Sequence, residues 1–338
     1  MAALGRGPAI VRAAHWLSHV EHDARSPVWA HWLRELSRDH KYIRYDQRGC
    51  GLSDQSPPAM AFEAWVDDLE AVVQAQGLKR FSLFGMSQGG GIAIAYAVRH
   101  PERVSRLVLC GAYARGVLRR DLNEQQREEA ELLVRLIRLG WGRDNPAFRQ
   151  VFTSQFIPEG TREQQQWFND LERLTASPEN AARIVETLYQ VDVTVEARSL
   201  RIPTLVMHAR DDARVPFEQG RQLAALIPNA RFVPLESRNH VLLDGEPAWS
   251  VFLREFRDFL GEDDAPGSTL QFAGLTTSER QVLELLARGL DNGAIARHLA
   301  KNEKTVRNQV SAIFGKLGTG TRAQAVALAR DAGIGGAS

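Results

Sequence analysis

Residues 81–99 read Phe-Ser-Leu-Phe-Gly-Met-Ser-Gln-Gly-Gly-Gly-Ile-Ala-Ile-Ala-Tyr-Ala-Val-Arg. This stretch joins a strand-like run, Phe81 to Phe84, to the turn Gly85-Met-Ser-Gln-Gly and a helical run, Gly90 to Arg99. A nucleophile elbow requires this order, because glycines relieve crowding around a strained turn that lifts the Ser87 hydroxyl clear of the sheet. The motif alone leaves a second interpretation open, a glycine-rich turn without chemistry, because chance gives G-x-S-x-G in roughly one such chain in ten.

Two later residues supply the partners that a nucleophilic serine needs. A serine is a poor nucleophile without a base and an orienting acid, and the expected order is Ser, then an acid, then His, each after a later strand. Asp212 follows the apolar run 204–207 with the spacing Asp-x-x-Val-Pro, and His240 follows the run 231–235. The pattern therefore predicts a catalytic triad of Ser87, Asp212 and His240.

Strand-like and helix-like segments alternate through the first 262 residues. Short apolar runs lie at 9–14, 42–45, 81–84, 104–109, 204–207 and 231–235. Helical patterns between them include 62–76, 90–99 and 217–226. Such alternation is typical of an α/β fold with a mainly parallel sheet and helices on both faces.

Residues 117–200 interrupt the alternation. Four successive helical patterns lie at 122–139, 146–155, 162–174 and 178–189. We interpret this segment as a helical cap placed where it covers the strand ends. Its aromatic residues either pack the cap helices together or, for one or two of them, line a pocket. They are Trp141, Phe148, Phe152, Phe156, Trp167 and Phe168.

These features resemble the α/β-hydrolase superfamily over about residues 1–262. The stretch Tyr45-Asp-Gln-Arg-Gly-Cys-Gly-Leu-Ser-Asp is similar to a structural loop of many members, in which Asp46 and Arg48 can pair. The resemblance implies an α/β-hydrolase fold with a helical cap and a serine hydrolase activity on an ester or lactone. We also expect an apolar pocket between cap and sheet, suited to a lipophilic ester, a lactone or an aromatic compound.

The oxyanion hole and the N-terminus depart from the family pattern. The hole should combine the backbone amide of Gln88 with one from the loop after an early strand. Members often carry His-Gly there, whereas this chain has Trp16-Leu-Ser-His-Val-Glu, so the amide of Val20 or His19 is expected to donate. The first clear strand begins soon after Met1, so the usual opening hairpin is shortened or absent, or the native start lies upstream.

Residues 275–338 have a different character. Thr276 and Glu279 form a capping box at the start of an apolar helical pattern, and Gly289 ends that helix. A short helical segment, 292–299, precedes a turn and a longer one, 304–317. Helix, short helix, turn and longer helix is the arrangement that places one helix in the major groove of DNA.

This segment resembles the LuxR-type helix-turn-helix domain over about residues 270–335. The matching residues are Leu275-Thr-x-x-Glu-Arg-x-Val-Leu, Gly289-Leu, Ile295-Ala, Leu299, Lys304-Thr-Val-Arg, Ile313, Lys316-Leu-Gly and Thr321-Arg-Ala-Gln-Ala-Val. The resemblance implies binding to double-stranded DNA at an inverted-repeat site by a homodimer, with Ala325, Val326 and Ala329 of the last helix in the dimer contact.

The resemblance also assigns roles along the recognition helix. Arg307, Asn308 and Ser311 are expected to face the groove, with Arg307 on a guanine and Asn308 on an adenine. Gln309 and Asn302 replace residues that are common in such domains. The residues expected to contact phosphates are Lys301, Lys304, Thr305 and Lys316.

Charge and composition agree with this division. Residues 275–338 contain nine Lys/Arg and five Asp/Glu, whereas the rest of the chain contains 33 and 36, so the small segment is the basic one. A polar Pro- and Gly-containing stretch predicts a linker at 263–274. Cys50 and Cys110 suit a reducing cytoplasm, and no membrane span, metal site or cofactor is expected.

Two functions fit these features. The first is a DNA-binding transcription regulator whose hydrolase-like domain senses a small organic effector, with the triad either hydrolysing that effector slowly or retained for recognition alone. The second is an active serine hydrolase that uses the helix-turn-helix for localisation or dimerisation. The identity of the effector, the operator sequence and the direction of regulation are not encoded in any motif.

Overall fold

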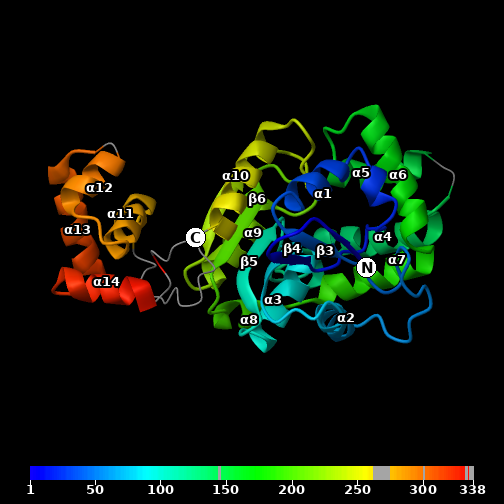
Figure 1. Cartoon of the computed structure of the whole chain (residues 1–338). Coiled ribbons are helices and arrows are strands. Elements are labelled where there is room, and N and C mark those ends of the chain that lie inside the picture. Colours follow the sequence, from blue (N-terminus) through cyan, green and yellow to red (C-terminus); the bar gives the residue numbers. More distant parts are fainter. Residues whose placement is uncertain (144–145, 262–274, 300, 332–333, 335–338) are drawn as a thin grey trace. The chain divides into compact units, whose positions relative to one another are not determined.

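The computed structural model describes residues 1–143, 146–261, 275–299, 301–331 and 334. The chain divides into two compact units, Met1–Leu260 and Gly261–Ser338 (Figure 1). The expected linker at 263–274 lies outside the described residues. Each unit has its own hydrophobic core.

The first unit is built on a seven-stranded sheet with the strand order β1-β3-β2-β4-β5-β6-β7. Its strands are β1 (Ala2–Leu4), β2 (Ala9–Arg12), β3 (Lys41–Arg44), β4 (Phe81–Met86), β5 (Val104–Cys110), β6 (Thr204–Ala209) and β7 (Arg231–Leu235). The six strands β2 to β7 run parallel, and β1 pairs antiparallel with β3 at one edge. The alternating pattern predicted those six strands, but it did not predict the three-residue β1.

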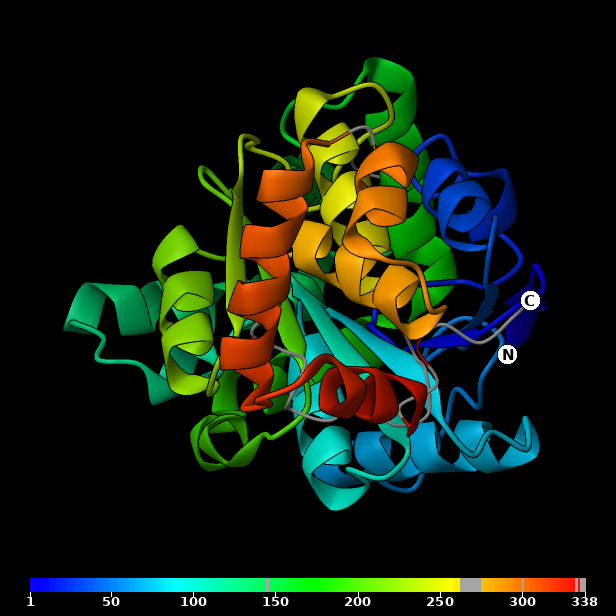
Figure 2. The same cartoon turned by 60° about the vertical axis from the view of Figure 1, so that its left-hand side comes forward.

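Helices cover both faces of the sheet (Figures 1 and 2). One face carries α1 (Ala30–Leu36) and α10 (Pro247–Gly261). The other carries α2 (Phe62–Ala75), α3 (Gly89–Arg99), α8 (Thr194–Ser199) and α9 (Phe217–Leu226). Trp32 of α1 contacts Phe252 of α10 and Phe84 of β4, with ring centroids 4.8 and 6.2 Å apart. These large buried rings fix α1 and α10 against the centre of the sheet.

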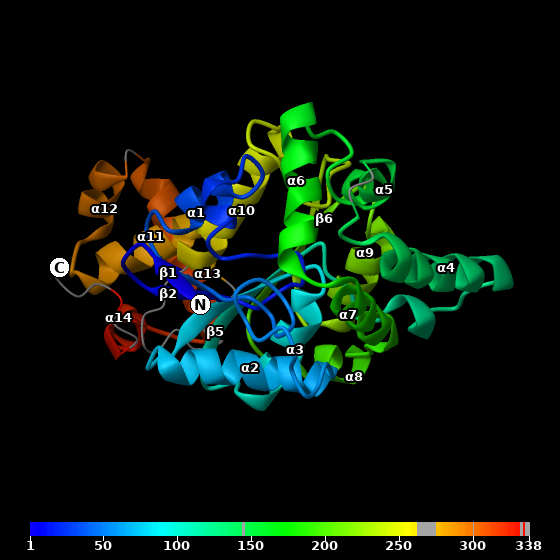
Figure 3. The same ribbon diagram turned by 90° about the vertical axis from the view of Figure 1, so that its right-hand side faces the viewer.

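Residues between β5 and β6 form a group of helices to one side of the sheet (Figure 3). They are α4 (Glu124–Gly140), α5 (Pro146–Phe156), α6 (Arg162–Thr175) and α7 (Pro178–Gln190). Trp141, Phe148 and Phe152 pack on one another, whereas Trp167 stacks on His22 of the body at 4.6 Å between ring centroids. Some of the cap aromatics therefore pack the helices together, as one interpretation predicts. Phe156 and Phe168 line a cavity, as the other predicts.

In the loop after β3, Asp46 and Arg48 do not pair with each other as expected. Arg48 donates to both carboxylate oxygens of Asp68 on α2, at 2.7 and 2.6 Å. Asp46 instead accepts from the amides of Val20 and Leu52, each at 3.0 Å, and from the hydroxyl of Ser18. The expected Asp46–Arg48 pair is therefore wrong. A buried carboxylate is satisfied here by amides and a hydroxyl, which tie the loop after β2 to the loop after β3.

The second unit contains α11 (Thr277–Ala287), α12 (Asn292–His298), α13 (Glu303–Leu317) and α14 (Arg322–Asp331). Thr276 accepts from the Glu279 amide, and the Glu279 side chain accepts from the Thr276 amide, so the expected capping box is present. Gly318 ends α13 in the left-handed conformation, at φ +64°, that glycine adopts without steric cost.

Helix α14 packs against α11 inside this unit. Ala325 and Ala329 are fully buried in the core of the unit, and Val326 packs partly against it. These residues were expected in a dimer contact, and that expectation is wrong for the two alanines, because a side chain buried within one copy cannot also face a second copy.

No helix in the described ranges is long and apolar enough to cross a membrane.

Candidate functional site

Ser87 lies at a sharp turn between β4 and α3. Its φ angle is +52°, and its amide donates to the carbonyl oxygen of Cys110 at the end of β5, at 2.9 Å. A Cβ on Gly85 would lie 2.7 Å from the Cα of Gly90, and a Cβ on Gly90 would lie 2.4 Å from the Cβ of Ala112. Glycine is therefore required at both positions by close packing, which holds the turn in its strained form.

Asp212 and His240 meet at the carboxyl ends of β6 and β7. His240 Nδ1 lies 2.8 Å from Asp212 Oδ2, and both side chains are 1% exposed. Asp212 Oδ1 accepts from the amides of Arg214 and Val215, each at 2.8 Å. Burial acts to raise the pKa of Asp212, but His240 and these hydrogen bonds outweigh it and lower that pKa. The ionised carboxylate thus orients the imidazole through its Nδ1–H.

The opposite nitrogen of His240 is available for chemistry. Nε2 is buried and has no hydrogen-bond partner among the described residues. The amides of His240 and Val241 both donate to the carbonyl oxygen of Phe156, at 2.9 and 3.1 Å. Gly111 adopts a φ of +59° beside the ring, where a Cβ would lie 2.9 Å from His240 Cε1. The histidine is therefore positioned by the acid, by helix α5 and by a residue that must be small.

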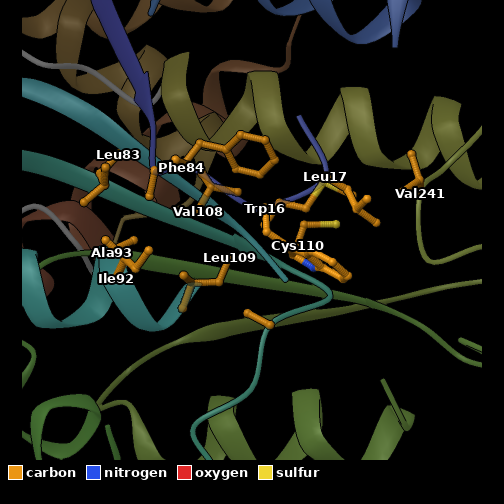
Figure 4. Packing of buried hydrophobic residues seen from close by; sticks show 14 of the residues in the cluster. Trp16, Leu17, Leu83, Phe84, Ile92, Ala93, Val108, Leu109, Cys110 and Val241 are labelled. Atoms are coloured by element: carbon orange, nitrogen blue, oxygen red, sulfur yellow. The ribbon is translucent and has the colours of Figure 1, made fainter. Parts of the chain in front are cut away.

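Ser87 and His240 line one cavity. Its other lining residues are His15, Trp16, Leu17, Trp29, Met86, Phe156, Phe168 and Val241. Figure 4 shows Trp16, Leu17 and Cys110 as members of the buried hydrophobic cluster that packs around the sheet. The cavity volume is about 20 Å³, enough for one water molecule. A groove of about 710 Å³ lies near α8 and α9, but no serine, cysteine or histidine lines it.

The oxyanion hole differs from the expectation in one of its two donors. Gln88 follows Ser87 at the start of α3 and its backbone amide stays the first expected donor, while its side chain donates to Gln47 at 2.5 Å. The amide of Val20 is bound to Asp46, and the amide of His19 lies 3.4 Å from Asp23 Oδ2. Neither is free to bind an oxyanion, so the choice of Val20 is corrected. Leu17, which lines the cavity, is the better candidate from the same loop.

Buried charges lie behind the cavity wall. Arg44 Nη1 is 3.2 Å from Asp23 Oδ2, and Arg12 Nη2 is 2.6 Å from His15 Nε2. Burial raises the pKa of Asp23 to about 7, although Arg12 and Arg44 act in the opposite direction. Burial and the charge of Arg12 hold the pKa of His15 well below its usual value. These residues were not predicted from the sequence, because charges inside strands give no signal until the fold brings them together.

The second unit presents one polar face along α13. Val306, Val310, Ile313 and Leu317 are buried on the opposite side of this helix. Arg307 Nη2 lies 3.2 Å from Glu303 Oε1, but both side chains are more than half exposed, so the pair leaves Arg307 accessible. Exposed residues expected to contact DNA are Lys304, Thr305, Arg307, Asn308 and Ser311.

Two of the lysines expected to contact phosphates have partners inside the unit. Lys316 Nζ donates to both oxygens of Glu279, at 2.9 and 2.7 Å. Lys301 Nζ donates to Ser278 at 2.5 Å and to Gln309 at 3.3 Å. These contacts fasten α13 and its preceding turn to the start of α11. Both lysines are partly exposed, so these contacts hold them at the surface of the unit, and their contact with phosphates stays a prediction.

The fold and the elbow together define a protein of the α/β-hydrolase class. Residues 24–247 match the α/β hydrolase fold family, which is more than half of the chain, and the chain belongs to this family. Residues 273–329 match the family described as bacterial regulatory proteins, luxR family. One polypeptide thus joins a hydrolase-fold domain to a LuxR-type DNA-binding domain.

Known hydrolases are similar to most of this chain. A 2-hydroxymuconate semialdehyde hydrolase of Pseudomonas sp. (strain CF600) is 30% identical over 267 residues, covering 70% of this chain and 83% of that protein. An AB hydrolase superfamily protein of Bacillus subtilis is 28% identical, covering 70% of this chain and 86% of that protein. The solved esterase of Exiguobacterium antarcticum superposes with a TM-score of 0.61 at 26% identity, covering 77% of this chain and 91% of that one.

Proposed function

We propose that this protein is a DNA-binding transcription regulator whose α/β-hydrolase domain binds a small organic effector. The observation that carries this proposal is the presence, in one chain, of a LuxR-type domain with an exposed polar recognition helix and a hydrolase-fold domain with an apolar cavity. A protein dedicated to hydrolysis has no need of a DNA reader. The DNA target is an inverted repeat bound by a homodimer in the cytoplasm.

The small volume of the cavity gives the effector a way to change the protein. About 20 Å³ beside Ser87 is too small for an organic molecule, so we expect binding to displace lining side chains, among them the cap residues Phe156 and Phe168. These residues belong to α5 and α6, and Phe156 also binds the loop that carries His240. Binding of an effector is therefore coupled to the position of the cap helices α5 and α6. Control of DNA binding requires that effector affinity differ between the DNA-competent and incompetent states.

Binding to duplexes selected from a randomised DNA pool tests the regulator. We expect the full-length chain to enrich a two-fold symmetric sequence, with an affinity that falls steeply as salt rises. Arg307→Ala should reduce specific affinity by about 10- to 100-fold, corresponding to the loss of one base contact. Arg288→Ala, which removes an exposed arginine at the end of α11, is the control and should have little effect. Failure to enrich any sequence would refute the proposal.

An active serine hydrolase is the second candidate, favoured by the hydrogen bond between His240 and Asp212. In this mechanism Ser87 Oγ attacks an ester carbonyl while His240 Nε2 takes its proton, and Asp212 stabilises the resulting imidazolium. The amides of Gln88 and Leu17 bind the oxyanion, and His240 protonates the leaving alcohol. Water, deprotonated by His240, then releases the acid from Ser87. The similar solved structure is named an esterase.

Hydrolysis of 4-nitrophenyl esters separates the two candidates. Turnover at ordinary enzymatic rates, abolished by Ser87→Ala, supports the hydrolase. If Ser87→Ala abolishes slow turnover but leaves effector-dependent DNA binding intact, the serine is dispensable for regulation and the regulator is favoured.

A further inference from the structure

A neutral imidazole forms part of the cavity wall beside Ser87. His15 follows β2, and its Nε2 lies 2.6 Å from the guanidinium of the buried Arg12. A guanidinium offers N–H donors and no acceptor, so Nε2 must be the unprotonated nitrogen that accepts. Burial and the charge of Arg12 hold the pKa of His15 well below its usual value, which keeps the ring neutral. The single ring proton is therefore on Nδ1.

Arg12 is itself fixed in place. Its guanidinium lies 5.2 Å from the ring centroid of Trp29, in a cation–π contact, and the residue is 2% exposed. Because Arg12 remains charged at any ordinary pH, it presents donors to His15 permanently. Arg12 therefore fixes the tautomer of His15, with the ring proton on Nδ1.

The cavity contains donors without acceptors. Among the described residues His15 has a hydrogen bond only at Nε2, so its Nδ1–H has no acceptor there, and the indole N–H of Trp29 is buried without a partner. Both residues line the cavity with Ser87, and their rings lie 5.3 Å apart. The remaining lining is largely apolar. The buried Trp29 donor is costly to leave unpaired, and the His15 donor on the same wall is free to bind an acceptor that enters the cavity.

We propose that His15 is a ligand-binding residue whose Nδ1–H donates to a carbonyl or carboxylate oxygen on an otherwise apolar effector. Arg12 is the positioning residue that fixes this tautomer. The inference rests on the proposed function in one respect, because it takes the cavity beside Ser87 as the effector site. It adds the chemical class of the effector, which is an aromatic or aliphatic body carrying an sp² oxygen.

Three probes of similar shape test the donor by calorimetry on the full-length protein. Acetophenone carries a carbonyl oxygen, ethylbenzene lacks it, and benzoate carries a carboxylate. We expect wild-type protein to bind acetophenone or benzoate about tenfold more tightly than ethylbenzene, the effect of one hydrogen bond. His15→Gln places an amide oxygen near the position of Nε2, which keeps a partner for Arg12, and should abolish the preference. His15→Asn places an amide nitrogen near the position of Nδ1 and should retain it.

The tautomer is tested without any ligand. In protein carrying ¹⁵N-labelled histidine, NMR should show His15 protonated at Nδ1 and unprotonated at Nε2, and Arg12→Met should release the ring to the Nε2–H form. An Nε2–H tautomer in the wild-type protein overturns the inference, even if His15→Asn does not fold. Binding of all three probes without preference overturns the inference but leaves the effector cavity standing. Binding of none overturns both the inference and the sensing role of the cavity.

Discussion

Ser87 is held in a backbone conformation that residues other than glycine rarely adopt. Its amide is tied to Cys110 on the neighbouring strand, while Gly85 and Gly90 allow β4 and α3 to approach too closely for any larger residue. The left-handed conformation costs a residue with a Cβ about 1–2 kcal/mol. Packing on both sides of the turn maintains this strain, and the strain keeps the hydroxyl exposed to the cavity.

We expect Ser87→Gly to be more stable than Ser87→Ala by about 1 kcal/mol, because both variants lack the hydroxyl and glycine alone tolerates a φ of +52°. Chemical denaturation of the two variants measures this difference. Ala97→Gly, in the regular part of α3, is the control and should destabilise the protein by about 1 kcal/mol. Equal stability of the two Ser87 variants would show that the turn is not strained.

Gly111 is expected to be essential for the position of His240. In Gly111→Ala the new Cβ would press on the imidazole, since it would lie 2.9 Å from Cε1, so hydrolysis of a 4-nitrophenyl ester should fall by about 100-fold or more. Gly77→Ala is a matched control, because Gly77 also has a positive φ but nothing lies within 4 Å of its Cβ position. If the two variants hydrolyse the ester equally fast, contact between the new Cβ and the His240 ring does not lower the rate.

Pairings between distant residues were the least predictable part of the site. Arg48 donates to Asp68 rather than to Asp46, the amide of Val20 donates to Asp46 rather than to an oxyanion, and Lys316 donates to Glu279, a partner that was not predicted. Each partner becomes a neighbour through the fold, not through spacing along the chain. By contrast, the Gly85-to-Gly89 turn is local, so its order of strand, turn and helix could be predicted from the sequence.

At the scale of elements, apolar periodicity predicted the six parallel strands, and the helices that were predicted in this unit lie within one or two residues of their expected ends, whereas α1 and α10 were not predicted. Long runs with a clear period carry enough local preference to determine their own structure. Strand β1 has three residues and an exposed pattern, so its conformation depends on pairing with β3. Helix α8, with six residues between two turns, escaped prediction for the same reason.

The start of α11 gives the second unit a predictable pH dependence. Lys316 and the Thr276 amide lower the pKa of Glu279 to about 2. An unfolded glutamate titrates near 4.3, so the folded pKa is the lower one. The stabilisation is therefore complete above about pH 4.3 and is lost as the pH falls toward 2. Hydrogen exchange of the α11 amides, corrected for intrinsic rates, should show protection declining in this range.

Two variants separate the contributions of Glu279 ionisation and of Lys316 to the pH dependence of the second unit. Glu279→Gln retains the amide oxygen for the capping box but cannot ionise, so the decline in protection below pH 4.3 should flatten. Lys316→Met should make the decline in protection below pH 4.3 smaller while leaving the capping box in place. An unchanged pH profile in both variants would contradict the assignment to Glu279.

At the scale of the whole molecule, the chain has two units with separate cores and matches two families, the α/β hydrolase fold over residues 24–247 and the luxR family of bacterial regulatory proteins over residues 273–329. If the proposed regulation holds, the factor by which an effector changes DNA affinity must equal the factor by which DNA changes effector affinity. Calorimetric titrations in the two orders should agree, with factors between about 5 and 150 for typical coupling. Arg307→Ala should leave effector affinity in the absence of DNA unchanged. Titrations that show no coupling in either order would refute the regulatory link.

The narrow space beside Ser87 has a consequence for timing. Because about 20 Å³ is too small for an organic effector, we expect its binding to wait for a rearrangement of the lining residues, which then sets the observed rate of binding. Stopped-flow traces should level off at a plateau as guest concentration increases, at a value in the microsecond-to-millisecond range of such motions. We expect release to need the same slow rearrangement, so the effect of the compound on DNA binding should outlast a brief exposure to it.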